Sequence, residues 1–333
     1  MRAVAPGRVN LIGDHTDYTG GLVFPMTIDR YTTIDFTVST ADDSHRVHLS
    51  SRDDPDSVTF QTTDPFNPAM HPRWGRYVAA VASLMSHPRG ITGDISTTIP
   101  VGAGLSSSAA LELSVALALG ANLNTSDLAT LTQQAEYLAT GVPTGIMDQL
   151  CIASGRNGHG TLIDCRNLSV RHVPIPNDIE FIVRFITHRT LEGSEYATRV
   201  AQCTVAEEII GPLRDAHIDQ TKDIADTVIR MRAQHVIAEN ERVLQFADAL
   251  VAGNFADAGE IMTLGHWSLS HLFETSTPHM DAAVRNLLDT PGVLGARMTG
   301  GGFGGCVVAM VEPGTEVDGW RVHPVDGAHI IND

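Results

Sequence analysis

Residues 100–110 read Pro100-Val-Gly-Ala-Gly-Leu-Ser-Ser-Ser-Ala-Ala110, a turn rich in glycine and serine. Before it, apolar residues alternate along 91–99, which predicts a half-buried strand. After it, an Ala- and Leu-rich stretch predicts a helix over 108–121. Gly102 and Gly104 let the backbone approach a ligand closely, and free N–H groups at a helix start attract anions. The turn is thus either a cradle for a di- or triphosphate or an ordinary strand-to-helix turn capped by serines.

The rest of the chain predicts a mixture of strands, hairpins and helices. Strands are expected over 22–38, 160–164, 179–186, 293–298 and 306–311. Helices are expected over 77–85, 126–140, near Asp148, over 215–253 (including 234–251) and over 280–288. Polar residues 42–72 predict hairpins and loops. Because the helices and hairpins do not alternate regularly, we predict an α+β fold. The length of 333 residues suggests two domains, with a boundary near 175–190.

Composition excludes several classes of protein. Lys and Arg number 22 against 39 Asp and Glu, a formal net charge of −17, which argues against binding nucleic acid through a basic face. No apolar run approaches the ~18–20 residues of a membrane helix, so no membrane partner is expected. The N-terminal residues lack a signal-peptide stretch, which predicts a cytoplasmic protein.

Cysteine and lysine patterns narrow the chemistry further. The four cysteines form no CxxC pair, so we expect neither a zinc site nor a disulfide framework. The Walker A pattern is absent and Lys222 is the single lysine. P-loop NTPases and protein kinases both place a lysine on the phosphates, and the sequence therefore excludes both classes.

A second segment reads Gly145-Ile-Met-Asp-Gln149 and follows Glu136 by one helix. An aspartate among apolar residues is costly unless it has a partner or a task. Asp148 is therefore a candidate functional carboxylate. The alternative is an acidic residue that only stabilises the dipole at a helix N-terminus.

A third segment reads Arg297-Met-Thr-Gly-Gly-Gly-Phe-Gly-Gly-Cys306, with five glycines among the six residues 300–305. A plain hairpin needs only one or two glycines. We expect this backbone to press against something large, either a ligand or the other glycine loop. A flexible surface hairpin is the alternative.

The N-terminal segment reads Ala5-Pro-Gly-Arg-Val-Asn-Leu-Ile-Gly-Asp-His-Thr-Asp-Tyr-Thr-Gly-Gly21. Arg8, Asp14, His15 and Asp17 place donors and acceptors within a few residues of each other. Such a cluster suits a polyhydroxylated ligand such as a sugar. The residues are too close for the usual spacing of metal ligands on one element, so we expect no metal here.

Together these four segments resemble the GHMP small-molecule kinases, and within them the galactokinases. Residues 7–21 are similar to the galactokinase signature, 100–110 to the phosphate loop, 145–149 to the catalytic segment and 298–306 to the third glycine motif. Residues 161–166 and the segment 189–196, followed by Arg199 and Cys203, agree as well. The resemblance extends to about residue 311.

The resemblance implies a two-domain α+β GHMP kinase fold. Residues 1–180 would form a domain like ribosomal protein S5 domain 2, and residues 181–333 a ferredoxin-like domain. The active site would lie in the cleft between them. The partners implied are a small-molecule sugar and ATP, with Mg²⁺ as cofactor, and we expect the protein to be a monomer.

The resemblance also assigns roles to residues. Asp148 would be the base near the sugar C1 hydroxyl, and Arg8 would stabilise its charge and that of the transferring phosphoryl group. The sugar hydroxyls would be held by Asp14, His15, Asp17 and Tyr196. The phosphates would be wrapped by Gly102, Ala103, Gly104, Leu105, Ser106, Ser107 and Ser108. Ser108 and Glu136 match Mg²⁺ ligands, and Trp74 and Tyr77 match an aromatic pair that flanks adenine.

The implied activity is ATP-dependent phosphorylation of the anomeric C1 hydroxyl of galactose to galactose 1-phosphate. The chain departs from the galactokinase pattern at Asp14, where glutamate is usual and would face the distal end of the sugar. It departs again after His266, where Leu269-Ser-His-Leu-Phe273 replaces the usual Arg-Asp-Asp. Two alternatives therefore stay open. One is a kinase for another monosaccharide, such as a hexosamine or another aldose; the other is a non-catalytic sugar and ATP sensor, against which Asp148, Arg8 and the intact phosphate loop argue.

Overall fold

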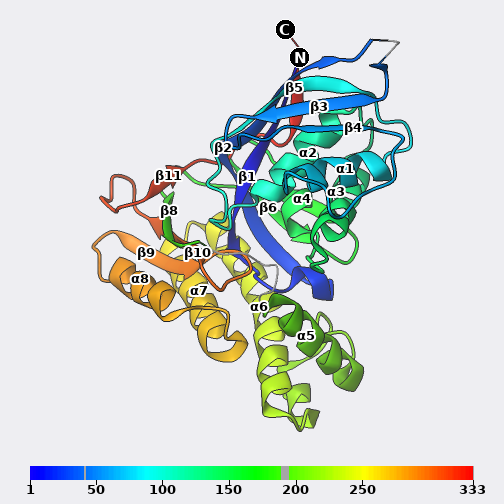
Figure 1. The fold of residues 1–333 in the computed structure, drawn as a ribbon. Helices are drawn as coiled ribbons and strands as arrows, with labels where there is room; N and C mark the ends of the chain where they lie inside the picture. The colour runs from blue at the N-terminus through cyan, green and yellow to red at the C-terminus, as the bar shows by residue number, and fades with distance from the viewer. Residues whose placement is uncertain (41–42, 189–194, 333) are drawn as a thin grey trace.

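Two β-sheets organise the chain in the computed structural model, which describes residues 1–40, 43–188 and 195–332 (Figure 1). The larger sheet runs in the order β12-β1-β2-β5-β3-β4, and β6 pairs with both β2 and β7. Its strands are β1 (Arg2–Ile12), β2 (Leu22–Val38), β3 (Arg46–Ser51), β4 (Val58–Gln61), β5 (Ile91–Thr97), β6 (His159–Asp164), β7 (Ser169–Pro174) and β12 (His329–Ile331). All of its pairings are antiparallel except that of β3 with β5.

The smaller sheet is antiparallel throughout and runs in the order β11-β8-β10-β9. It consists of β8 (Glu180–Thr187), β9 (Val293–Met298), β10 (Gly305–Val311) and β11 (Trp320–Val322). Strand β10 is buried along its whole length because it lies between two strands and under helices. This sheet and the larger one confirm the expected α+β class.

Helices gather in two groups (Figure 1). The first group comprises α1 (Gly75–Leu84), α2 (Ser107–Ala118), α3 (Thr125–Thr140) and α4 (Met147–Ser154) and lies beside the larger sheet. The second comprises α5 (Tyr196–Ile210), α6 (Thr227–Ala252), α7 (Phe255–Ser268) and α8 (Pro278–Leu288). Short helical turns are η1 (Asp17–Thr19), η3 (Ile218–Asp223) and the π-helical turn η4 (Leu269–Phe273).

Helix ends follow the signals in the sequence. Asn124 caps α3 by accepting from the backbone N–H of Asp127, and Gly141 ends the helix with φ 72°. Helix α6 begins in the same way, with the Asp226 side chain accepting from Ile229 N–H, and ends at Gly253. The caps of α3 define the ends of the helix that carries Glu136.

One of the buried hydrophobic clusters contains residues of both groups of elements. Phe24 of β2 and Phe246 of α6 pack edge to face with ring centroids 5.5 Å apart. The predicted division into residues 1–180 and 181–333 separates the strands of the two sheets with one exception. The exception is β12, which lies in the second part and pairs with β1 of the larger sheet. The domain boundary itself stays a prediction.

Most predicted elements are confirmed. Strands over 22–38 and 293–298 match β2 and β9 residue for residue, and the polar stretch 42–72 contains the β3–β4 hairpin. The helical prediction over 215–253 was too broad, because a 3₁₀ turn and a break precede α6. Strands β1 and β7 and helices α5 and α7 were not predicted.

Candidate active site

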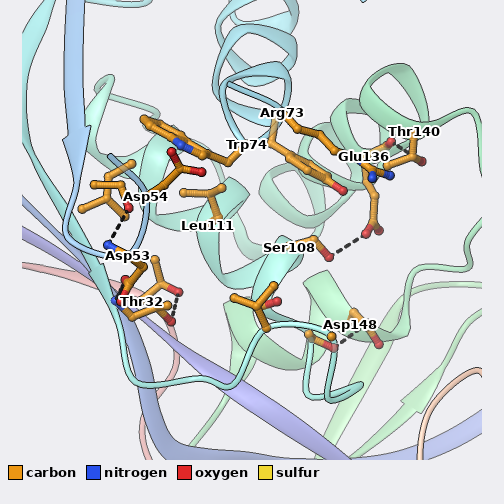
Figure 2. Close-up of a pocket in the computed structure, with 18 of the residues that line it drawn as sticks. Thr32, Asp53, Asp54, Arg73, Trp74, Ser108, Leu111, Glu136, Thr140 and Asp148 are labelled. Carbon is orange, nitrogen blue, oxygen red and sulfur yellow. Dashed lines mark hydrogen bonds between the residues drawn. The ribbon is translucent and has the colours of Figure 1, made fainter. Parts of the chain in front are cut away.

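A cavity of about 630 Å³ opens between the phosphate loop, the start of α1 and the loop after β3 (Figure 2). Asp148 and Glu136 line it, together with Gly102, Gly104 and Ser106–Ser108. Ala103 and Leu105 are instead buried in the core, so only their backbone could face a ligand. Since Gly102 and Gly104 have φ of 75° and 79°, the loop depends on residues without a side chain there.

Arg8 and Asp148 form the central ion pair of this site. The Arg8 side chain is 2 % exposed, and its Nε and Nη2 each lie 2.7 Å from one Asp148 oxygen. Its Nη1 donates to the carbonyl of Gly104 at 2.8 Å. Burial alone would lower the pKa of Arg8, but the charge and hydrogen bonds of Asp148 outweigh it and raise that pKa. Arg8 thus stays charged and ties the candidate base to the phosphate loop.

Ser106 makes a contact that the sequence did not predict. Its hydroxyl donates to Asp148 Oδ2 at 2.5 Å rather than facing only the phosphate side of the loop. The residue has φ 61°, a left-handed conformation that is rare outside glycine. The loop conformation therefore aims Ser106 at Asp148, while Ser107 begins helix α2.

Ser108 and Glu136 lie together at the N-terminal end of α2. The Ser108 hydroxyl donates to Glu136 Oε1 at 2.7 Å (Figure 2). Glu136 Oε2 accepts from Thr144 Oγ1 at 3.1 Å and from Gln149 Nε2 at 2.8 Å. Burial and the nearby charge of Asp148 raise the pKa of Glu136.

This donor set fits a cation that is shared with a phosphate ligand. Mg²⁺ prefers oxygen ligands and usually keeps waters and substrate phosphate oxygens in its shell. One hydroxyl and one carboxylate, Ser108 and Glu136, are enough for that mode of binding. Among the described residues no cluster of three or more His, Cys, Asp or Glu side chains is placed to hold a metal ion alone.

Trp74 and Tyr77 line the far part of the same cavity. Sequence reasoning missed three other lining residues there, namely Asp53, Asp54 and Arg73. Figure 2 shows Arg73 reaching across the cavity towards Glu136 and Thr140. Arg73 could have been predicted because it precedes Trp74 in the sequence. Asp53 gave no such signal because it lies in a polar loop, where its carboxylate accepts from Thr97 N–H at 3.1 Å.

The predicted sugar residues do not line this cavity. The His15 ring is 5.4 Å from that of Tyr196 and 4.7 Å from that of Phe273, and its Nδ1 lies 3.1 Å from the Tyr18 hydroxyl. His15 has φ 66°, which turns its side chain into this aromatic group. Phe273, on η4, was not predicted as a site residue. Residues 189–194 of the segment before Tyr196 lie outside the described residues.

Asp17 adjoins the catalytic segment directly. A Cβ on Gly145 would lie 1.9 Å from Asp17 Oδ2, so this glycine makes room for the carboxylate. Burial and the charge of Asp148 raise the pKa of Asp17 to about 7. Asp17 thus lies against the segment that leads into Asp148.

Asp14 is anchored deeper than the other sugar candidates. Its side chain is 1 % exposed; Oδ2 accepts from Arg297 Nη2 at 2.7 Å and Oδ1 from Gly300 N–H at 2.9 Å. Arg297 also pairs with Glu239 of α6 at 2.9 Å. Burial raises the pKa of Asp14 despite the charge of Arg297. Direct contact of Asp14 with a sugar stays a prediction.

The third glycine segment is packed rather than a free hairpin. Gly300 bonds Asp14, and Thr299 Oγ1 both donates to the carbonyl and accepts from the N–H of Asn10. A Cβ on Gly302 would lie 2.5 Å from the carbonyl oxygen of Thr275. This close packing excludes a free surface hairpin, but the partner is not the other glycine loop that the sequence suggested. The contact is with the N-terminal segment and residue 275.

Comparisons with known proteins agree with this geometry. The galactokinase galactose-binding signature matches residues 1–37, the GHMP kinase N-terminal domain residues 76–156, and the GHMP kinase C-terminal domain residues 246–319. A galactokinase of Chloroflexus aurantiacus is 40 % identical over 98 % of this chain and 87 % of its own length. A galactokinase of a Roseiflexus species is 40 % identical over 92 % of this chain and 82 % of its own.

Solved structures show the same relationship. Lactococcus lactis galactokinase complexed with galactose has a TM-score of 0.90 at 29 % identity, covering 98 % of this chain and 94 % of that one. Methanococcus jannaschii mevalonate kinase has a TM-score of 0.69 at 20 % identity, covering 98 % of each chain, and shows the shared fold alone. Within the described residues, no helix has the length and apolar character needed to span a bilayer.

Proposed function

The chain belongs to the galactokinases of the GHMP kinase family, and we propose that it transfers the γ-phosphoryl group of ATP to the C1 hydroxyl of galactose. The observation that carries this proposal is the Asp148 carboxylate, which Arg8 and Ser106 hold between the phosphate loop and the Asp17–Gly145 contact. A carboxylate between a phosphate cradle and a polar cluster suits the transfer of phosphoryl to a hydroxyl.

Asp148 acts as the base. A sugar hydroxyl is a weak nucleophile, so a carboxylate beside it accepts its proton as the O–P bond forms. Arg8 keeps its charge because of Asp148, and it therefore neutralises both the carboxylate and the negative charge on the transferring group. Arg8 itself stays protonated and is no base.

Ser108 and Glu136 hold the divalent cation, which we propose is Mg²⁺. When bound, Mg²⁺ neutralises charge on the β- and γ-phosphate oxygens. The backbone N–H groups of residues 102–107 and the start of α2 orient the phosphates. Arg73 adds a positive charge on the opposite wall, and Trp74 and Tyr77 enclose the adenine.

His15, Asp17 and Tyr196 hold the sugar hydroxyls beside Asp148. Asp14 fixes the segment that carries His15 and Asp17, because Arg297 and Gly300 bind its carboxylate. One observation favours an acceptor other than galactose: the side chain of Asp14 is short, and its carboxylate is bound by Arg297 and Gly300. Action as a cytoplasmic monomer stays a prediction of the sequence.

The test is ADP release from MgATP over a panel of free sugars. The panel is galactose, talose, glucose, galactosamine, N-acetylgalactosamine, mannose and arabinose. We expect galactose to have the highest kcat/KM. If another sugar has the highest kcat/KM, the proposed phosphoryl transfer stands and that sugar is the acceptor. Sugar binding without ADP release would favour the sensor alternative.

A further inference from the structure

Glu112 is a buried acid that the proposed mechanism does not use. It lies on α2 four residues after Ser108, and therefore on the same helix face. Its side chain is 0 % exposed. Oε2 accepts from Gln149 Nε2 at 3.1 Å, and Oε1 has no hydrogen-bond partner among the described residues. Burial of such a group is costly without a compensating role.

Gln149 connects Glu112 to the cation ligand. Its Nε2 donates to Glu112 at 3.1 Å and to Glu136 at 2.8 Å, which uses both of its N–H bonds. Gln149 follows Asp148 in the first turn of α4 and is itself fully buried. One amide group thus touches both carboxyl groups and adjoins the base.

Three helices meet at this amide. Helix α2 supplies Ser108 and Glu112, α3 supplies Glu136, and α4 supplies Asp148 and Gln149. The Ser108–Glu136 bond closes a ring of hydrogen bonds through Gln149 and Glu112 back to α2. A fixed donor such as Gln149 selects one rotamer of Glu136, and hydrogen-bonded outer partners of this kind orient metal ligands.

The charges near this ring of hydrogen bonds bear on the protonation of Glu112. Arg8 compensates Asp148, whereas the hydrogen bonds described above for Glu112 and Glu136 come from neutral donors. Burial, followed by the charge of Glu136, raises the pKa of Glu112 well above its usual range. Glutamine is therefore the closest neutral mimic of this side chain in shape and hydrogen bonding.

We propose that Glu112 and Gln149 are positioning residues that fix the Glu136 carboxylate for the divalent cation and couple it to the helix that carries Asp148. The inference rests on the proposed function, since Glu136 is there a cation ligand. It assigns to Glu112 no contact with substrate. Its hydrogen bond to Gln149, and not its charge, is what the site requires.

The experiment compares Glu112→Gln with Glu112→Met. Calorimetry measures binding of AMP-PNP, a non-hydrolysable ATP analogue, across a titration of Mg²⁺. We expect Glu112→Met to raise the half-saturating Mg²⁺ concentration by about tenfold, which corresponds to about 1.4 kcal/mol. Glu112→Gln should remain within about twofold of the wild type. Binding of AMP-PNP without Mg²⁺ should change little in both variants.

Two further variants keep the proposal falsifiable. Gln149→Met should raise the Mg²⁺ requirement in the same way if Glu112→Met does not fold. Ile152→Val removes a buried methyl group on α4 away from the ring, and it should lower Tm without altering the Mg²⁺ requirement.

An unchanged Mg²⁺ requirement in Glu112→Met or Gln149→Met, or an equal rise in Glu112→Gln, would overturn the positioning role. The wild-type sugar panel is a separate test, because a chain that phosphorylates no sugar can still bind Mg-AMP-PNP. Failure of the proposed function is therefore distinguishable from failure of this inference.

Discussion

At the scale of single residues, Asp148 is held by three hydrogen bonds, two from Arg8 and one from Ser106. Its position therefore depends on two other elements, strand β1 and the phosphate loop. Removal of its charge should affect chemistry more than binding, because no contact to nucleotide is assigned to it.

Asp148→Asn should lower kcat by about 10²–10⁴-fold, the usual contribution of a general base. The amide cannot accept the hydroxyl proton, and it also leaves the Arg8 charge uncompensated, so Tm should fall as well. Coupled measurement of ADP release gives kcat, and calorimetry with Mg-AMP-PNP serves as the control for nucleotide binding. Activity within tenfold of the wild type would contradict the role of Asp148.

Ser106→Ala tests whether the loop positions the base. The variant loses a hydrogen bond to a charged group, which contributes about 1.5–3 kcal/mol. We expect kcat to fall by roughly tenfold or more with an unchanged KM for galactose. Ser107→Ala is the matched control on the neighbouring residue. Equal effects of the two substitutions would show that the serines act only on the phosphates.

Asp17 should give sugar binding a pH dependence near neutrality. Its pKa is raised to about 7, and the ionised form is the stronger acceptor of hydroxyl hydrogen bonds because both of its oxygens carry negative charge. KM for galactose should therefore fall as pH rises through about 7, and Asp17→Asn should flatten the profile. The stability effect has the opposite sign. Between about pH 4 and 7 the folded state holds the extra proton, so the free energy of unfolding falls as pH rises across that window.

At the scale of elements, Arg297 of β9 joins three parts of the chain. It pairs with Asp14 after β1 and Glu239 of α6, and all three side chains are buried. Burial by itself would raise the pKa of Glu239, but the charges of Arg297 and Arg242 lower that pKa below its usual range. The sugar segment, α6 and the third glycine segment are therefore held as one unit.

Arg297→Met should lower the free energy of unfolding by about 3–5 kcal/mol, because it leaves the buried Asp14 carboxylate without its ion-pair partner and removes one of the two cations beside Glu239. Chemical denaturation followed by circular dichroism measures the loss. Arg285→Met, which removes a cation that lies 5.2 Å over the Trp267 ring, is the control and should cost less than about 1 kcal/mol. A loss of that small size in Arg297→Met would show that the buried network contributes little.

Sequence patterns predicted elements with a clear periodicity and missed others for identifiable reasons. Strand β1 is buried on both faces after Arg2, so it shows no alternation of polar and apolar residues. Helix α7 contains Gly259 and Gly265, which lower helix propensity. Both glycines serve packing, since a Cβ on Gly259 would lie 2.1 Å from the carbonyl oxygen of Leu294.

The candidate site was predicted as four segments but not as contacts. Arg8 and Asp148 are 140 residues apart, and Asp14 and Arg297 are 283 apart, so only the folded chain brings them together. The sequence indicated Asp148 because a carboxylate among apolar residues needs a partner. It gave no sign that Ser106 would turn towards Asp148 or that Asp14 would turn towards Arg297.

At the scale of the whole molecule, the last strand joins the first. Residues 329–331 pair with 2–4, and the preceding segment bonds α4 through Gly327 N–H to Gly155 and Ala328 N–H to Ile152. The Thr27 hydroxyl also donates to the Val325 carbonyl at 2.5 Å. The C-terminal segment thus supports the helix that begins at Asp148.

Removal of residues 323–333 should therefore lower Tm by at least about 5 °C and reduce kcat, although the deleted segment lines no part of the cavity. Differential scanning calorimetry and the ADP assay measure the two effects. Deletion of only Asn332 and Asp333 leaves β12 intact and is the control. An unchanged Tm in the longer deletion would show that β12 is dispensable.

The pairing of β12 with β1 also has a consequence for folding during synthesis. Residues 2–4 of β1 are synthesised about 325 residues before their partners at 329–331. Until then β1 presents an open edge, the kind of surface on which other strands add and aggregates begin. A chain released before residue 329 would keep that edge exposed, whereas synthesis through residue 331 allows the edge to be covered.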